Sequence, residues 1–201
     1  MRYLLLAALA TLAFSGCQKL TTLEVNSDYC SLYMLPLMQF SVSYPADLEP
    51  DLPTAGMSNM EYLFLYKTDT TSTTRIQTES IAFGALSLSA DSVEQDKDME
   101  VMIGKLEENY SQAGFELEDS FTGIEEFDGK EYRMFRATGT IDREEYELQG
   151  RYRILILIIK PEFHDNGLII SMMARDDSPI QSYEDFANKG SISKAWSSLE
   201  I

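Results

Sequence analysis

Residues 154–159, Ile-Leu-Ile-Leu-Ile-Ile, are apolar at every position. A strand with one face in water alternates between apolar and polar residues, so an unbroken apolar run indicates a strand that is covered on both faces. Such a strand needs neighbouring strands on its two edges and a packing layer on each side. This requirement constrains the fold more than any other segment of the chain.

Alternating apolar and polar residues predict the strands that surround this one. The expected strands cover residues 38–44, 60–66, 76–88, 115–127, 130–141, 146–160 and 167–175. We interpret Gly84 as the position of a bulge. Asp128-Gly129 and Asn166-Gly167 lie where strands join, and such dipeptides are typical of two-residue hairpin turns because both residues adopt positive φ. Most strands are therefore expected to pair antiparallel.

Helical periodicity appears in two places. A helix is expected to begin at Asp91 or Ser92 and to end at Gly114. Its apolar stripe consists of Met99, Met102, Ile103, Leu106 and Tyr110. A second helical region covers residues 183–199. The order of three strands, helix, four strands and helix predicts an α+β fold, in which a mainly antiparallel sheet of six or seven strands lies between helical layers, an α/β/α sandwich.

The first seventeen residues have the pattern of a secretory signal. Arg2 precedes an apolar run of twelve residues from Tyr3 to Phe14, and small residues lead into Cys17. As a helix this run would span about 18 Å, which is too short for a bilayer core of about 30 Å. We therefore expect a signal peptide at 1–16, a tether at 17–35 and a single domain at 36–201.

The segment Phe-Ser-Gly-Cys that ends at Cys17 resembles the lipobox of bacterial lipoproteins. The resemblance implies that Cys17 is acylated and that the protein is anchored in the bacterial cell envelope. Gln18 stands where the family places Asp to retain a lipoprotein in the inner membrane, so the resemblance favours the outer membrane in a cell that has one. The alternative is an ordinary cleaved signal and a soluble secreted protein.

The charge of the chain limits its partners. Removing residues 1–16 takes away one of 16 basic residues and none of the 33 acidic ones, so the net charge changes from −17 to −18. A surface this negative repels nucleic acid and anionic lipid, which argues against both as partners. Membrane attachment would then come from the lipid. Acidic surfaces mostly serve solubility, and a basic partner is the minority case.

Few residues suggest catalysis. His164 is the one histidine, which rules out a multi-histidine metal site, and its position beside a predicted turn favours exposure to solvent. With Cys17 acylated, Cys30 has no partner in the chain, and we interpret it as an incidental thiol rather than a reactive or intermolecular one. The acidic residues of 91–100 do not form an EF-hand loop. Counted from Asp91, such a loop needs a glycine at its sixth position and a glutamate at its twelfth, where this chain has Asp96 and Met102. No catalytic, metal or cofactor site is predicted.

Two arginines on one predicted strand admit two interpretations. Arg133 and Arg136 lie on opposite faces of the strand at 130–141. Each can form a salt bridge with a neighbouring acid, and one of them can line a ligand groove. We favour the salt bridge.

The opening of the domain, Phe40-Ser-Val-Ser-Tyr-Pro45, is similar to the F-x-I-x-Y-P opening of the PsbP/Mog/DcrB-like superfamily. The order of elements agrees over residues 37–201, and Ala195-Trp196 near the end is similar to the closing motif. The chain departs from the family in lacking a tryptophan soon after the proline, where Leu48 stands. The resemblance implies a PsbP-like fold and a mostly non-enzymatic group of accessory and protein-binding members.

These observations lead to three hypotheses of different classes. The first is a lipid-anchored, non-enzymatic envelope protein that binds another protein. The second is a lipoprotein that binds a small ligand in a pocket between the sheet and a helix, which a deep apolar pocket with convergent polar groups would favour. The third is a hydrolase-type enzyme, which a buried and strongly perturbed carboxylate in a cleft would favour.

Overall fold

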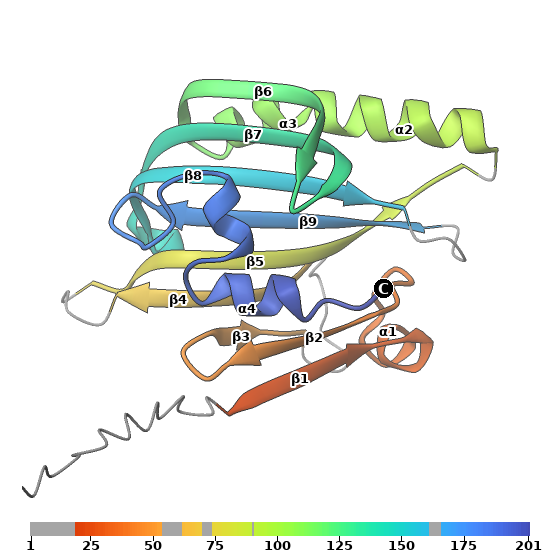
Figure 1. The fold of residues 1–201 in the computed structure, drawn as a ribbon, viewed down its shortest axis with the longest axis horizontal. Helices are drawn as coiled ribbons and strands as arrows, with labels where there is room; N and C mark the ends of the chain where they lie inside the picture. Colours follow the sequence, from red (N-terminus) through yellow and green to blue (C-terminus); the bar gives the residue numbers. More distant parts are fainter. Residues whose placement is uncertain (1–18, 54–61, 70–73, 90, 161–165) are drawn as a thin grey trace, which may run out of the picture.

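A computed structural model describes the chain except residues 1–18, 54–61, 70–73, 90 and 161–165. Its main sheet contains strands β3 (Glu49–Asp51), β4 (Tyr62–Asp69), β5 (Ile76–Ser87), β6 (Glu116–Phe127), β7 (Lys130–Arg143), β8 (Leu148–Ile159) and β9 (Asn166–Arg175). The spatial order is β3-β4-β5-β9-β8-β7-β6, and all neighbours pair antiparallel (Figure 1). The predicted antiparallel sheet is confirmed, and of the strands in this main sheet only β3 was not predicted.

Strand β8 lies inside this sheet, between β7 and β9. Its residues Ile154–Ile158 are at most 4% exposed. The side chains of Ile154, Ile156 and Ile158 belong to one apolar cluster, and those of Leu155 and Leu157 belong to another. Successive side chains of a strand point to opposite faces, so both faces of β8 are covered, as its unbroken apolar sequence predicted.

Different layers cover the two faces. Helices α2 (Ser92–Gly104) and α3 (Leu106–Gln112) lie on one face, where Met99 and Ile103 join the cluster of Ile154. The other face carries a two-stranded sheet and short helices (Figure 1). These elements are β1 (Leu20–Val25), α1 (Ser27–Tyr33), β2 (Phe40–Pro45), the 3-10 helix η2 (Glu184–Ala187) and α4 (Ile192–Ser197). The expected second helical layer is therefore partly a sheet, because β2 pairs with β1 and not with the main sheet.

The prediction of a tether over 17–35 is wrong for the part that the structure describes. Leu23, Val25 and Cys30 from β1 and α1 are buried in the core, and the side chain of Asn26 caps α1 by accepting from the backbone N–H of Tyr29 at 3.0 Å. The thiol of Cys30 is in hydrogen-bonding contact with the backbone N–H of Met38 at 3.4 Å. These residues belong to the domain, and Cys17 lies outside the described residues.

Two glycine predictions have different outcomes. Asp128 and Gly129 have φ angles of 51° and 76° and join β6 to β7, which confirms the hairpin turn. Asn166 and Gly167 instead begin β9, where they pair with β5. Gly84 pairs in register, and the irregularity of that strand pair lies between Lys67 and Thr68.

Gly84 has a packing role in place of the expected bulge. A Cβ atom at this position would collide with the ring of Tyr62. The missing side chain therefore leaves room for an aromatic ring to lie over the backbone of β5.

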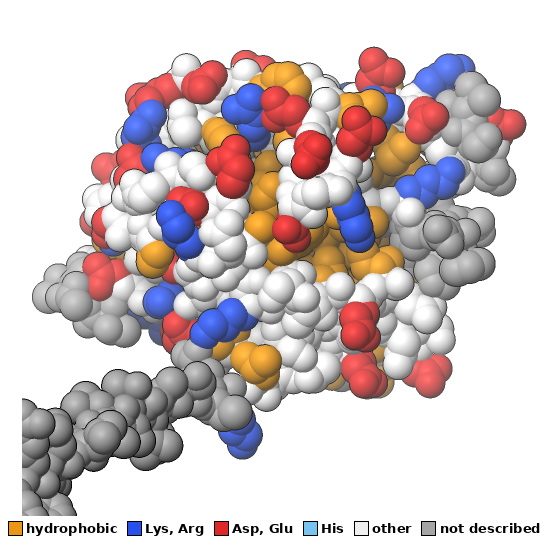
Figure 2. All heavy atoms as spheres, in the orientation of Figure 1, with side chains coloured by type: hydrophobic (Ala, Val, Ile, Leu, Met, Phe, Trp, Pro, Cys, Tyr) orange, Lys and Arg blue, Asp and Glu red, His pale blue; other side chains and the backbone are white. Residues whose placement is uncertain are grey.

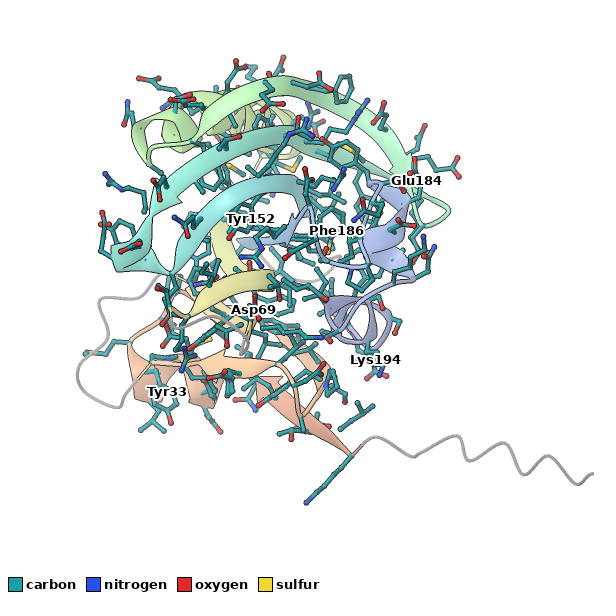
Figure 3. All side chains as sticks on the ribbon, turned by 90° about the vertical axis from the view of Figure 1, so that its left-hand side faces the viewer. Tyr33, Asp69, Tyr152, Glu184, Phe186 and Lys194 are labelled. Carbon is teal, nitrogen blue, oxygen red and sulfur yellow. The ribbon has the colours of Figure 1, made fainter. Side chains whose placement is uncertain are left out.

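The curved sheet buries large side chains beneath its strands. Tyr152 and Phe186 point into the interior, whereas Tyr33 lies at the outer edge (Figure 3). The hydroxyl of Tyr152 donates to the backbone carbonyl of Gln77 at 2.8 Å. Among the described residues, no helix has the length and apolar character needed to cross a membrane.

A buried carboxylate fixes the C-terminal helix to the sheet. Glu79 of β5 has a side chain only 1% exposed, and its Oε2 accepts from the backbone N–H groups of Ser191 at 2.6 Å and Ile192 at 3.3 Å. Gly190 precedes them with φ of 73°, in the left-handed region that favours glycine. This arrangement satisfies backbone donors at the start of α4 and holds the helix against β5.

Candidate functional site

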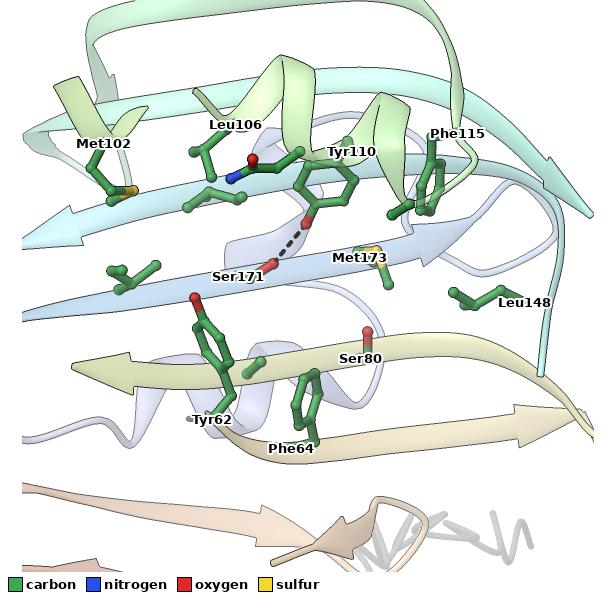
Figure 4. Close-up of a pocket in the computed structure, with 15 residues that line it drawn as sticks. Tyr62, Phe64, Ser80, Met102, Leu106, Tyr110, Phe115, Leu148, Ser171 and Met173 are labelled. Carbon is green, nitrogen blue, oxygen red and sulfur yellow. Dashed lines mark hydrogen bonds between the residues drawn. The ribbon is translucent and has the colours of Figure 1, made fainter. Parts of the chain in front are cut away.

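The helical layer covers only part of its face of the sheet. Helix α2 contacts β7 and α3 contacts β6, and a groove of about 320 Å³ opens between these helices and strands β4, β5 and β9 (Figure 4). Its lining residues are Tyr62, Phe64, Ser80, Ala82, Met102, Leu106, Asn109, Tyr110, Ala113, Phe115, Leu148, Ile156, Ile169, Ser171 and Met173. We call this feature the sheet–helix groove.

Strand and helix periods explain why these residues meet. Tyr62 and Phe64 alternate with Leu63 and Leu65, which are buried on the opposite face. Ser171 and Met173 alternate in the same way with Ile170 and Met172 on β9. On the helices, Met102, Leu106 and Tyr110 recur every four residues and form one wall. All three belong to the apolar helical stripe that was predicted from the sequence.

The polar centre of the groove is a pair of hydroxyls. The phenol oxygen of Tyr110 lies 3.2 Å from Oγ of Ser171 (Figure 4). The ring of Tyr110 stacks on Phe135 at a centroid distance of 5.9 Å and meets the edge of Phe115 at 5.3 Å. Burial raises the pKa of Tyr110 to about 12, so the phenol is neutral near pH 7 and able to donate a hydrogen bond.

None of the described residues that line the groove has a charged side chain. Two adjoining hollows continue it. One shares Met102 and Asn109 with the groove and brings in Asp98 and Lys105. The other shares Phe115 and four further lining residues and brings in Asp51, Arg143, Glu145 and Glu147. The sheet–helix groove is thus apolar at its centre and charged at its ends.

A second hollow, with a mixed polar and aromatic lining, lies on the opposite side of the sheet. Hydrophobic side chains are exposed near the centre of the face that carries α4 (Figure 2). A hollow of about 330 Å³ on this side is lined by Asp128, Lys130, Tyr132, Ile159, Trp196, Ser197, Leu199 and Ile201. The indole N–H of Trp196 donates to the carboxylate of Asp128 at 2.9 Å, which holds the ring in place. We call it the aromatic hollow.

A serine beside a lysine is the arrangement nearest to a hydrolase. Oγ of Ser191 lies 3.2 Å from Nζ of Lys67 and 2.6 Å from a carboxylate oxygen of Asp47. The ammonium group of Lys67 also forms ion pairs with Asp47 at 3.1 Å and Glu79 at 4.0 Å, so two carboxylates already engage it. The N–H groups of Ser191 and Ile192 already bind Glu79, so they are not free to stabilise an oxyanion.

The pKa of Asp47 does not fit an acid catalyst. Partial burial tends to raise this pKa, but hydrogen bonds from Ser191 and Lys67 outweigh burial and leave it below its ordinary value. The carboxyl is therefore ionised near pH 7. The cluster stabilises α4 and does not have the features of a catalytic site. Within the described ranges, no group of three or more His, Cys, Asp or Glu side chains could hold a metal ion.

The residues singled out from the sequence do not converge on the groove. Cys17 and His164 lie outside the described residues. The guanidinium of Arg136 binds Glu125, with Nε 2.9 Å from Oε2, and lies 4.9 and 5.1 Å from the ring centres of Phe121 and Tyr183, so the predicted salt bridge is confirmed for this arginine. The acidic residues of 91–100 include the cap Asp91, which accepts from the backbone N–H of Glu94 at 3.2 Å.

No protein-family model and no curated protein matches the sequence. The solved structures that are similar in fold include the following three. The Ran-binding protein Mog1p of Saccharomyces cerevisiae is 11% identical, with a TM-score of 0.44 over 92% of this chain and 96% of its own. A Mog1 point mutant is 10% identical, with a TM-score of 0.43 over 91% and 96%.

The third structure is a Bacteroides thetaiotaomicron protein that is 12% identical, with a TM-score of 0.42. The match covers 81% of this chain but only 44% of that protein, so this chain spans less than half of its length. At these identities and TM-scores, the three structures carry no argument about what this chain binds.

Proposed function

We propose that the chain is a non-enzymatic binding protein for a small, uncharged and mostly apolar ligand, held in the cell envelope by a lipid on Cys17. The observation that carries the ligand-binding part is the sheet–helix groove, with about 320 Å³ of space and a lining of apolar and hydroxyl-bearing side chains. Small-molecule pockets in proteins commonly measure 300–1,000 Å³ and combine an apolar lining with a few placed polar groups.

A protein partner is the second candidate, and the aromatic hollow favours it. Trp196 and Tyr132 lie there beside Asp128 and Lys130. Tryptophan and tyrosine are enriched among the residues that dominate protein interfaces. A net charge of −18 after removal of the signal would steer a basic partner, and its association would weaken as salt rises.

A probe dye tests the ligand-binding proposal. N-phenyl-1-naphthylamine is uncharged at pH 8 and fluoresces when it enters an apolar site, so we expect saturable fluorescence with the domain. Ala113 is exposed and lines the groove, and Ala113→Trp should weaken dye binding by about tenfold because the new ring occupies the site. The matched control Ala113→Ser should bind like wild type. Equal affinities of the Trp and Ser variants would contradict the proposal.

The anchor has a structural consequence that tests the account of the N-terminus. Leu20 begins β1, so an extended chain from Cys17 reaches at most about 11 Å to the fold. A lipid on Cys17 would therefore hold the domain close to the bilayer. Cys17→Ala should move the protein from the membrane fraction to the soluble fraction or leave it unprocessed, whereas Cys30→Ser should remain membrane-bound. A mature wild-type protein without acyl mass by mass spectrometry would contradict the anchor.

A further inference from the structure

The hydroxyl pair in the sheet–helix groove is held in place before any ligand arrives. Ser171 is on β9, where its backbone pairs with Ala82 on one side and Ile156 on the other. The ring of Tyr110 is fixed by Phe115 and Phe135. Of two hydroxyls in contact, one donates to the other, so one proton remains to be donated and lone pairs remain to accept. The pair therefore suits a single neutral oxygen, as in an alcohol or a carbonyl group.

An ionised head group does not suit this position. None of the described residues lining the groove is a lysine, arginine or histidine. Burying a carboxylate away from any cation is costly, because the surrounding dipoles do not replace its hydration. Arg143 lines an adjoining hollow, but its Nε lies 3.1 Å from Oε1 of Glu145, so this cation already has a carboxylate partner. The negative charge of the whole protein also repels anions.

The apolar walls on both sides of the hydroxyl pair suit an aliphatic chain. Met102 and Leu106 lie toward one end, and Leu148 and Met173 lie toward the other (Figure 4). Methionine side chains adapt to flexible apolar groups because they are unbranched and polarisable. The adjoining hollows extend the groove at both ends, so a long narrow ligand fits better than a compact one.

We infer that the ligand is an uncharged amphiphile, an aliphatic chain carrying a neutral oxygen as in a long-chain alcohol or acyl ester, and that this oxygen binds Tyr110 and Ser171. This inference rests on the proposed function and specifies the ligand of the same groove. Tyr110 and Ser171 are then its specificity-determining residues. The head group is selected by two effects, namely a hydrogen bond for a neutral oxygen and a desolvation penalty against a charge.

Displacement of N-phenyl-1-naphthylamine from the mature domain at pH 8 tests the inference. Decanol should displace the dye at a concentration at least tenfold lower than decanoate, which is ionised at this pH. Tyr110→Phe keeps the ring and removes the hydroxyl. It should raise the dissociation constant of decanol about three- to tenfold more than it raises the dissociation constant of the dye. Ser171→Ala should act in the same direction. Tyr33→Phe, at the outer edge of the domain and outside both the groove and the aromatic hollow, is the matched control and should change neither affinity.

The outcomes separate the ligand class from the proposed function. Two results would show that the inferred head group is wrong while ligand binding in the groove remains supported. In one, the dye binds but decanoate displaces it as effectively as decanol does. In the other, Tyr110→Phe lowers the affinity for decanol no more than it lowers the affinity for the dye. If wild-type protein does not bind the dye at all, the ligand-binding function fails together with the inference. A selective loss of affinity for decanol in Tyr110→Phe and Ser171→Ala supports both the ligand-binding function and the inferred head group.

Discussion

Ile156→Asp is expected to destabilise the domain by more than about 4 kcal/mol, enough to unfold most of it. Ile156 is 3% exposed on the central strand β8 and packs in the cluster that includes Ile103 and Phe135. An aspartate there would be a buried charge, and no basic residue belongs to that cluster. Equilibrium urea unfolding followed by circular dichroism measures the effect, provided that the variant can be purified folded.

The same substitution on an exposed strand position serves as the control. Ile124 on the edge strand β6 is 58% exposed, so Ile124→Asp should change the free energy of unfolding by less than about 1 kcal/mol. If Ile156→Asp is too unstable to purify, Ile156→Ala should still cost about 2–5 kcal/mol through the cavity that it leaves. Similar stabilities for Ile156→Ala and Ile124→Ala would contradict the interior position of β8.

Gly190→Ala is expected to cost about 2–4 kcal/mol, because two effects add. The residue adopts φ of 73°, which L side chains rarely adopt, and a Cβ atom would lie 2.5 Å from Oε2 of Glu79. Glu79 cannot move away without giving up its hydrogen bonds to the N–H groups of Ser191 and Ile192. A buried carboxylate without partners is strongly unfavourable, so the substitution should loosen α4 from β5.

Gly104 provides the matched control for this prediction. A Cβ atom there meets nothing within 4 Å, and the residue lies at the end of α2. Gly104→Ala should therefore be neutral or stabilise by about 0.4–1 kcal/mol. Thermal unfolding of the two variants against wild type measures the difference. Equal melting temperatures would show that Glu79 does not fix α4 in the way described.

Much of the sheet could be predicted because its strands carry strong patterns. The apolar run of β8 and the alternation of β4 and β7 reflect local burial, and the Asp128-Gly129 turn reflects backbone conformation that few residue pairs favour. Strand β1 was missed because only Leu23 and Val25 of its six residues are buried, which leaves no clear alternation. The pairing of β2 with β1 is a long-range choice that local sequence does not encode.

The sheet–helix groove could not be predicted in the same way. Met102, Leu106 and Tyr110 belong to one apolar stripe with Met99 and Ile103, and only the position of the helices over the sheet decides which of them are buried. One signal was present in the sequence. Ser171 interrupts the apolar run of residues 168–174, and a small polar residue in such a run marks a place where a hydroxyl faces a partner or an open space.

The most direct test of ligand binding in the sheet–helix groove is an NMR titration of the domain with decanol, observed at methionine methyl groups labelled with carbon-13. Met102 and Met173 line the groove, whereas Met38 and Met172 are buried in the cluster on the opposite face of the sheet. We expect the methyl signals of Met102 and Met173 to shift progressively and saturate, while those of Met38 and Met172 stay in place. Saturating shifts confined to Met38 and Met172, or no saturable shift at Met102 and Met173, would contradict binding in the groove.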